Sequence, residues 1–131
     1  MYVEHRTYSI TPGRVGDYLA GYGPRGYPIQ KRYLGDCCLG SYLTEIGGVP
    51  EITMMWRFDT IDQRMERKAQ NDRDADWQAL MADRLTPYVE QVVTKMITPA
   101  PFWTDTDIDG SRYAYVEQRT YSIKSGRVGA Y

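Results

Sequence analysis

The sequence predicts an α+β domain of the ferredoxin-like type, with an antiparallel sheet and the order strand, helix, strand, strand, helix, strand. Two segments of helical periodicity separate segments in which β-branched and aromatic residues are concentrated. Gly47, Gly48 and Pro50 stand between the second and third expected strands, which predicts a hairpin there. Together these features give the βαββαβ pattern.

The first expected strand, Tyr2–Ile10, carries charges on a face that also carries aromatic groups. Residues two apart in a strand share a face. One face therefore holds Tyr2, Glu4, Arg6, Tyr8 and Ile10, and the other holds Val3, His5, Thr7 and Ser9. Two interpretations stay open for the Glu and Arg: they pair at a surface, or they line a polar pocket.

The next segment predicts a broken or kinked helix that begins near Arg14, is interrupted by Gly21, Gly23 and Pro24, resumes over 27–34 and is closed by Gly35. Gly21, Gly23 and Gly26 form a GxGxxG pattern. A dinucleotide site is not expected there, because the pattern lies inside a helical segment and Pro24 has no amide hydrogen for a phosphate.

A hairpin is expected from strands 37–46 and 51–59, followed by a helix that starts at a capping box of Thr60 and Gln63. The apolar face of this helix is expected to contain Ile61, Met65 and Ala69. Its charged residues are expected on a solvated surface: Asp62, Arg64, Glu66, Arg67 and Lys68.

Asp72 and Asp74 mark the start of a further helix, which runs through Trp77 and Leu85 towards Pro87. Residues 90–97 then predict the last strand. The first domain is expected to span 1–103, followed by a linker over 104–112 that is rich in Asp.

The stretch Tyr2–Ile10 occurs a second time, as Tyr115–Ile123, and the match stays in register as far as Tyr18 and Tyr131. So long a match is typical of a duplicated domain. Residues 113–131 are therefore expected to begin a second, incomplete repeat, and the chain is expected to be a fragment of a tandem protein. The strand in this repeat would pair with a sheet or stay unpaired.

Composition excludes several classes of protein. Sixteen basic and seventeen acidic residues nearly cancel, so no nucleic acid partner is expected. No apolar run is long enough to span a bilayer, and no basic or apolar leader follows Met1, so we expect a cytoplasmic protein without a membrane partner. Cys37 and Cys38 are adjacent, which favours reduced thiols. No set of metal ligands can be assembled, so no metal site is expected.

A four-stranded sheet with helices on one side leaves its other side open. A second domain is expected to cover that side, supplied either by a homodimer or by the second repeat of the same chain.

Several short motifs resemble the NIPSNAP family over residues 2–103. None is specific alone, but their order and intervals match. The motifs are Glu4, Arg6, Thr7 and Tyr8; Pro28 to Arg32 before Leu34 and Gly35; Thr44 to Gly47; Trp56 to Asp59 before Arg64; and Thr98 to Phe102.

The resemblance implies a dimeric α/β barrel that holds a small apolar or aromatic molecule between sheet and helices, with no cofactor, as in several proteins of that superfamily. The ligand-binding residues that it implies are Arg6, Tyr8, Tyr33, Glu45, Trp56 and Arg57. Arg6 would hold a carboxylate or enolate oxygen, Tyr8 or Tyr33 would donate a hydrogen bond, and Glu45 would be the only plausible base. Tyr33 and Met54 stand where many relatives carry histidines, and neither is a good base at neutral pH.

Structural roles remain open for the same residues. Met54, Trp56 and Phe58 are expected in the core, and Arg6 is expected to pair with Glu45 or Glu4. Three functions therefore compete: a small-molecule binding or enzymatic barrel, a non-catalytic protein interaction module, and a vestigial fragment. Whether the chain is an enzyme, and which residues would be catalytic, the sequence leaves unknown.

Overall fold

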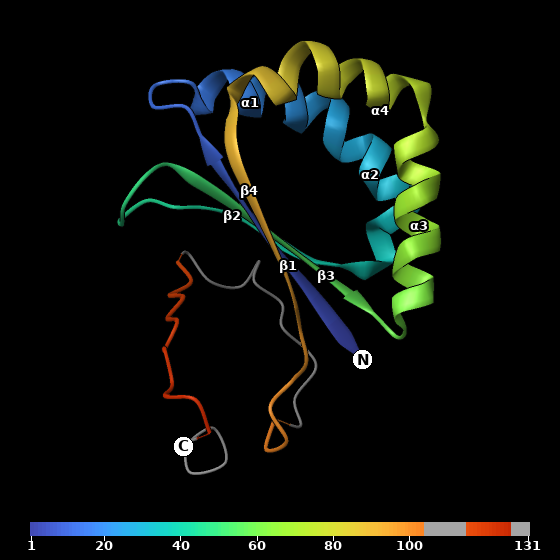
Figure 1. Cartoon of the computed structure of the whole chain (residues 1–131). Coiled ribbons are helices and arrows are strands. Elements are labelled where there is room, and N and C mark those ends of the chain that lie inside the picture. Colours follow the sequence, from blue (N-terminus) through green and yellow to red (C-terminus); the bar gives the residue numbers. More distant parts are fainter. Residues whose placement is uncertain (104–114, 127–131) are drawn as a thin grey trace.

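The computed structural model describes residues 1–103 and 115–126. Its sheet contains β1 (Tyr2–Ile10), β2 (Cys38–Leu43), β3 (Glu51–Phe58) and β4 (Val89–Ile97). The helical segments all lie on one side of this sheet, as Figure 1 shows. The expected linker 104–112 lies outside the described residues, as do 113–114 and 127–131 of the expected repeat.

The strand order is β2-β3-β1-β4, and every neighbouring pair is antiparallel. Tyr8 at the centre of the sheet lies opposite Ile52 of β3 and Val92 of β4. This is the ferredoxin-like arrangement that the element order predicts. The predicted second strand is shorter than expected: it ends at Leu43, so Glu45 lies in the loop before β3 and not on a strand.

The first crossover contains α1 (Val15–Gly21), a π-helical turn (Tyr22–Gly26), α2 (Tyr27–Leu34) and a 3-10 turn (Gly35–Cys37). The predicted interruption is therefore a π turn that keeps the chain helical. A Cβ at Gly26 would lie 2.8 Å from the Tyr22 ring and 3.1 Å from Leu80. The last glycine of the GxGxxG pattern thus permits close packing between the two crossovers.

The second crossover contains α3 (Ile61–Arg73), α4 (Ala75–Leu80), a π turn (Met81–Leu85) and a 3-10 turn (Thr86–Tyr88). The Thr60 side chain caps α3 by accepting the Gln63 amide at 3.1 Å, and Gln63 Oε1 accepts the Asp59 amide at 2.8 Å. Asp74 caps α4 by accepting the Trp77 amide at 3.0 Å. Both caps agree with the sequence-based expectation, because capping is decided by neighbouring residues.

We expect Thr60→Ala to lower the free energy of unfolding by about 1 kcal/mol, since the Gln63 amide would lose its acceptor. Chemical denaturation measures the change. Thr60→Ser is the matched control, because it keeps the hydroxyl, and it should lie close to the unsubstituted chain. Equal losses for Ala and Ser would assign the effect to the methyl group.

The core lies between the sheet and the helices. Met54, Trp56 and Phe58 are each at most 2% exposed, which confirms that they are core residues. Cys37 is buried, Cys38 is half-buried, and both are free thiols. Within the part of the chain that the structure describes, no helix is both long and apolar enough to cross a membrane.

The side of the sheet that faces away from the helices carries the alternate residues of each strand, among them His5, Thr7, Met55 and Arg57. Residues 115–126 lie on this side (Figure 1). Gln118 Nε2 is 2.9 Å from His5 Nε2. Of the two outcomes expected for the second copy, the structure shows the unpaired one, because residues 115–123 form no strand and are exposed throughout. A strand-like sequence is not sufficient to form a strand in this segment, because a strand requires a partner strand with free backbone hydrogen-bonding groups.

Candidate functional site

Helix α3 faces the sheet with its charged side. Ile61 and Met65 are 41% and 58% exposed, whereas Lys68 and Asn71 are buried. The expected orientation of this helix, and the expected solvation of Arg64 and Lys68, are therefore wrong. The reason is the carboxylate of Glu4, which the alternation of β1 directs into the interior, where it requires cations as partners.

Glu4 is the centre of a buried ion-pair cluster and is 0% exposed. Its Oε1 lies 2.7 Å from Nη2 of Arg6 and 3.4 Å from Nζ of Lys68. Its Oε2 accepts from Nε of Arg64 at 2.5 Å. The predicted alternative of an Arg6–Glu4 pair is thus correct, and the cluster contains three cationic side chains around one carboxylate.

Burial and neighbouring charges shift the pKa values of Glu4 and Lys68. Burial raises the pKa of Glu4, but the charges of Lys68, Arg6 and Arg64 outweigh it and hold that pKa below its usual value. Burial, together with the charge of Arg6, lowers the pKa of Lys68 to about 8, although Glu4 partly opposes the shift. Lys68 is therefore the one amine of the cluster that can exchange a proton near neutral pH.

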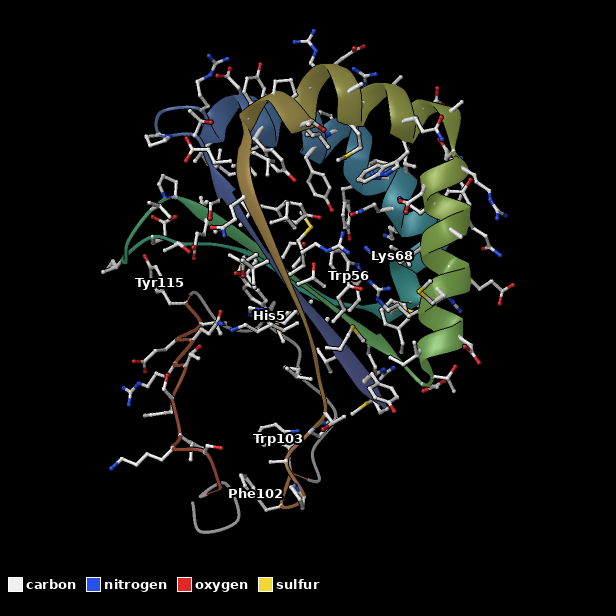
Figure 2. The ribbon with its side chains drawn as sticks, in the orientation of Figure 1. His5, Trp56, Lys68, Phe102, Trp103 and Tyr115 are labelled. Carbon is white, nitrogen blue, oxygen red and sulfur yellow. The ribbon has the colours of Figure 1, made fainter. Side chains whose placement is uncertain are left out.

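Two aromatic side chains border the cations. Lys68 Nζ lies 4.5 Å from the centroid of the Trp56 ring, and Arg6 Cζ lies 5.9 Å from it. Figure 2 shows Trp56 and Lys68 on facing elements. The Tyr8 hydroxyl accepts a weak 3.4 Å bond from Arg6. Burial raises the pKa of Tyr8, which keeps the phenol neutral.

Among the described residues, three buried polar atoms at the cluster have no hydrogen-bond partner: Glu4 Oε1, Arg6 Nε and Asn71 Oδ1. Glu4 Oε1 is nevertheless close to two cations, so its missing bond reflects angle and not distance. Incompletely satisfied buried groups are unusual in native proteins, and strain, a catalytic role or a bound water or ion accounts for them.

The cluster is accessible from the side of β4. Val92 lies beside Tyr8, and Met96 lies beside Glu4, on the face that the helices cover elsewhere. They are 47% and 38% exposed, so the helices do not close this edge. Thr94, beside Arg6, is exposed as well.

The structure brings together three of the six predicted site residues: Arg6, Tyr8 and Trp56. Tyr33 lies at a different junction, where its hydroxyl donates to Asp74 Oδ2 at 2.9 Å. Glu45 is exposed in the loop after β2. Arg57 lies on the opposite side of the sheet from Trp56, because consecutive strand residues alternate.

Each side of the sheet has a hollow of its own. Beside Trp56, a space of about 10 Å³ has room for about one water, which is too small for an organic ligand. The open side has a hollow of about 310 Å³ that Arg57 borders. Its other lining residues are apolar or small: Met1, Val3, Leu39, Met55, Ile97, Thr98, Pro99, Ala100, Phe102 and Trp103.

Sequence reasoning did not find Arg64, Lys68 and Asn71 as site residues. A signal was present, because 64, 68 and 71 have the spacing of one helix face. The strand pattern already directed Glu4 and Arg6 to one face, and an inward carboxylate implies a cationic helix opposite it. No group of three His, Cys, Asp or Glu residues that could hold a metal occurs in the described part of the chain.

Fold and cluster together define a ferredoxin-like α+β domain with a cationic, aromatic-lined site beneath its third helix. The NIPSNAP family model matches residues 3–103, and the chain belongs to the NIPSNAP family. No curated protein matches.

Solved structures agree with this assignment. A NIPSNAP family protein of unknown function from Agrobacterium tumefaciens is 33% identical, with a TM-score of 0.73, over 79% of this chain and 91% of that one. An uncharacterised NIPSNAP domain protein from Burkholderia xenovorans is 30% identical, with a TM-score of 0.72, over 80% and 100%.

A protein described as a putative antibiotic biosynthesis monooxygenase, from Bordetella bronchiseptica, is 21% identical, with a TM-score of 0.55, over 76% of this chain and 96% of that one. At this identity the likeness concerns the fold alone.

Proposed function

We propose that this NIPSNAP domain binds a small apolar or aromatic organic molecule that carries one acidic oxygen, a carboxylate or an enolate. The ligand enters along β4 and places its oxygen near Arg6 and Lys68, with its apolar part against Val92 and Met96. The observation that supports this most directly is the excess of positive charge: three cationic side chains surround the Glu4 carboxylate, and Asp72 nearby adds one further negative charge.

Charge and shape both favour such a ligand. Arginine offers a planar fork of donors that suits a carboxylate. An anion would offset the mutual repulsion of the cations, and the partly dry surroundings strengthen that attraction. The apolar exposed residues of β4 suit the rest of an organic acid, whereas a simple inorganic ion would leave them in water.

A catalytic form of this proposal assigns proton transfer to Lys68 in place of Glu45. Glu45 is exposed in a loop, whereas Lys68 is at the cluster with a pKa lowered to about 8. An amine with this pKa can take a proton from a carbon acid whose enolate oxygen Arg6 holds, without a cofactor.

The open side of the sheet is the proposed seat of a second copy, supplied by a homodimer or by a second repeat. Val93 and Ile97 are 40% and 42% exposed there, and Phe102 is 84% exposed. Exposed apolar residues next to a hollow are typical of an interface. This side also favours the alternative function, a non-catalytic interaction module.

A thermal-shift panel of small aliphatic and aromatic carboxylates, each paired with its uncharged amide, tests the ligand class. We expect acids, and not amides, to raise the melting temperature, since a ligand at 100 times its Kd stabilises by about 2.7 kcal/mol. Lys68→Met should abolish the shift because it removes one cation from the site and adds no new charge.

Lys95→Met is the matched control, because Lys95 is exposed on the open side of the sheet, where it is the cross-strand neighbour of His5. It should leave the shift unchanged. Equal shifts from acids and amides, or an undiminished shift in Lys68→Met, would contradict the proposed site.

A further inference from the structure

The chain contains two copies of its central strand. Tyr2–Ile10 and Tyr115–Ile123 agree at eight of nine positions, and the one difference is His5 against Gln118. That position points to the open side of the sheet, away from the helices. The residues that face the core and the ion-pair cluster are the same in both copies: Glu4 and Glu117, Arg6 and Arg119, Tyr8 and Tyr121, Ile10 and Ile123.

The position of β1 in the sheet can be reached from the end of β4. Val3, near the start of β1, lies opposite Ile97, the last residue of β4, and the two strands are antiparallel. A chain that leaves β4 and turns back therefore enters the β1 position in the direction of β1. Seventeen residues, 98–114, connect Ile97 to Tyr115. They can span far more than the roughly 5 Å between neighbouring strands.

The second copy already lies next to the strand that it duplicates. Gln118 is 2.9 Å from His5, its own counterpart in the first copy (Figure 2 labels His5). Glu117 accepts from Arg119 Nε at 2.6 Å, which repeats the Glu4–Arg6 pair in an exposed setting. The segment is thus close to the sheet and has the side chains that the β1 position requires.

We propose that residues 115–123 are a second occupant of the β1 position, exchange with Tyr2–Ile10 of the same chain, and then complete the ion-pair cluster with Glu117 and Arg119. This inference does not depend on the proposed ligand. The N-terminal copy is favoured in the unsubstituted chain, because only four residues, 11–14, join it to α1, and a short closed loop costs less entropy. The second copy enters when the first is weakened.

Thr7→Pro weakens the first copy without touching the cluster. Thr7 pairs with Thr53 and Val93 in the middle of both ladders, and its side chain is on the open side. Proline in a central strand removes a ladder donor. We expect Thr7→Pro to remain folded, with slow hydrogen exchange moving from amides 3–10 to amides 116–123.

Thr120→Pro is the matched control, and it should leave the melting temperature unchanged. Thr7→Pro with Thr120→Pro should be unfolded at 25 °C, because neither copy can then pair. This non-additivity is the signature of exchange. Equal unfolding of the single Thr7→Pro variant and the double variant would overturn the proposal, as would a folded Thr7→Pro chain whose amides 116–123 exchange rapidly.

Light scattering distinguishes exchange within one chain from exchange between chains. A monomeric Thr7→Pro chain with protected amides 116–123 supports the proposal. Protection that appears only in a dimer and is lost on dilution would overturn it.

Discussion

Replacement of Glu4 by Gln, in a chain that also carries Glu117→Gln, is expected to lower the free energy of unfolding by about 3–5 kcal/mol. Glu4 is 0% exposed and is the partner of three cations. Without its charge, Arg6, Arg64 and Lys68 repel one another in partly dry surroundings. The second substitution is included so that the duplicate strand cannot restore the carboxylate. Urea denaturation at neutral pH measures the loss.

Glu117→Gln alone is the control, because it makes the same chemical change at an exposed duplicate of the site. Exposed ion pairs contribute about 0–1 kcal/mol, so this variant should be nearly as stable as the unsubstituted chain. A double variant within about 1 kcal/mol of the control would show that the cluster does not depend on Glu4.

The free energy of unfolding of the unsubstituted chain, minus that of Lys68→Met, is expected to rise by up to about 3 kcal/mol between pH 8 and pH 10.5. The pKa of Lys68 is about 8 in the folded chain, whereas the ordinary pKa of a lysine is 10.5. Between these values the unfolded state holds the proton and the folded state has released it. Stability from this group therefore rises with pH, and the Met variant lacks the increase.

The comparison between variants is essential, since other groups titrate in the same range with the opposite sign. Burial raises the pKa of Cys37 and of Tyr18, which favours unfolding as the pH rises. These groups are present in both chains and cancel in the difference. Unfolding curves at pH 7, 8, 9 and 10 measure the difference, and a constant difference would refute the lowered pKa.

Structural features that depend only on residues close together in the chain could be predicted from the sequence. The strand–helix order, the Thr60 and Asp74 caps and the helical interruption after Gly21 follow from period and from turn or capping residues, which act over a few positions. The same order predicted an antiparallel sheet with one open side, and the NIPSNAP resemblance added the dimeric α/β barrel and the candidate ligand-binding residues. The short-range sequence patterns placed Arg6, Tyr8 and Trp56 on strands, but they could not show which side chains from other elements contact these residues.

The sequence alone thus determined the element order, the split of β1 into two faces and the duplication of that strand. Only the tertiary structure decided which side of α3 turns inward and that Arg64 and Lys68 meet Glu4, sixty residues away from Arg64. The physical reason is that a buried carboxylate must find compensating charge. The free energy of pairing this carboxylate outweighs the free energy that burial of Ile61 and Met65 would contribute. It depends on contacts between residues far apart in the chain, which short-range sequence patterns do not show.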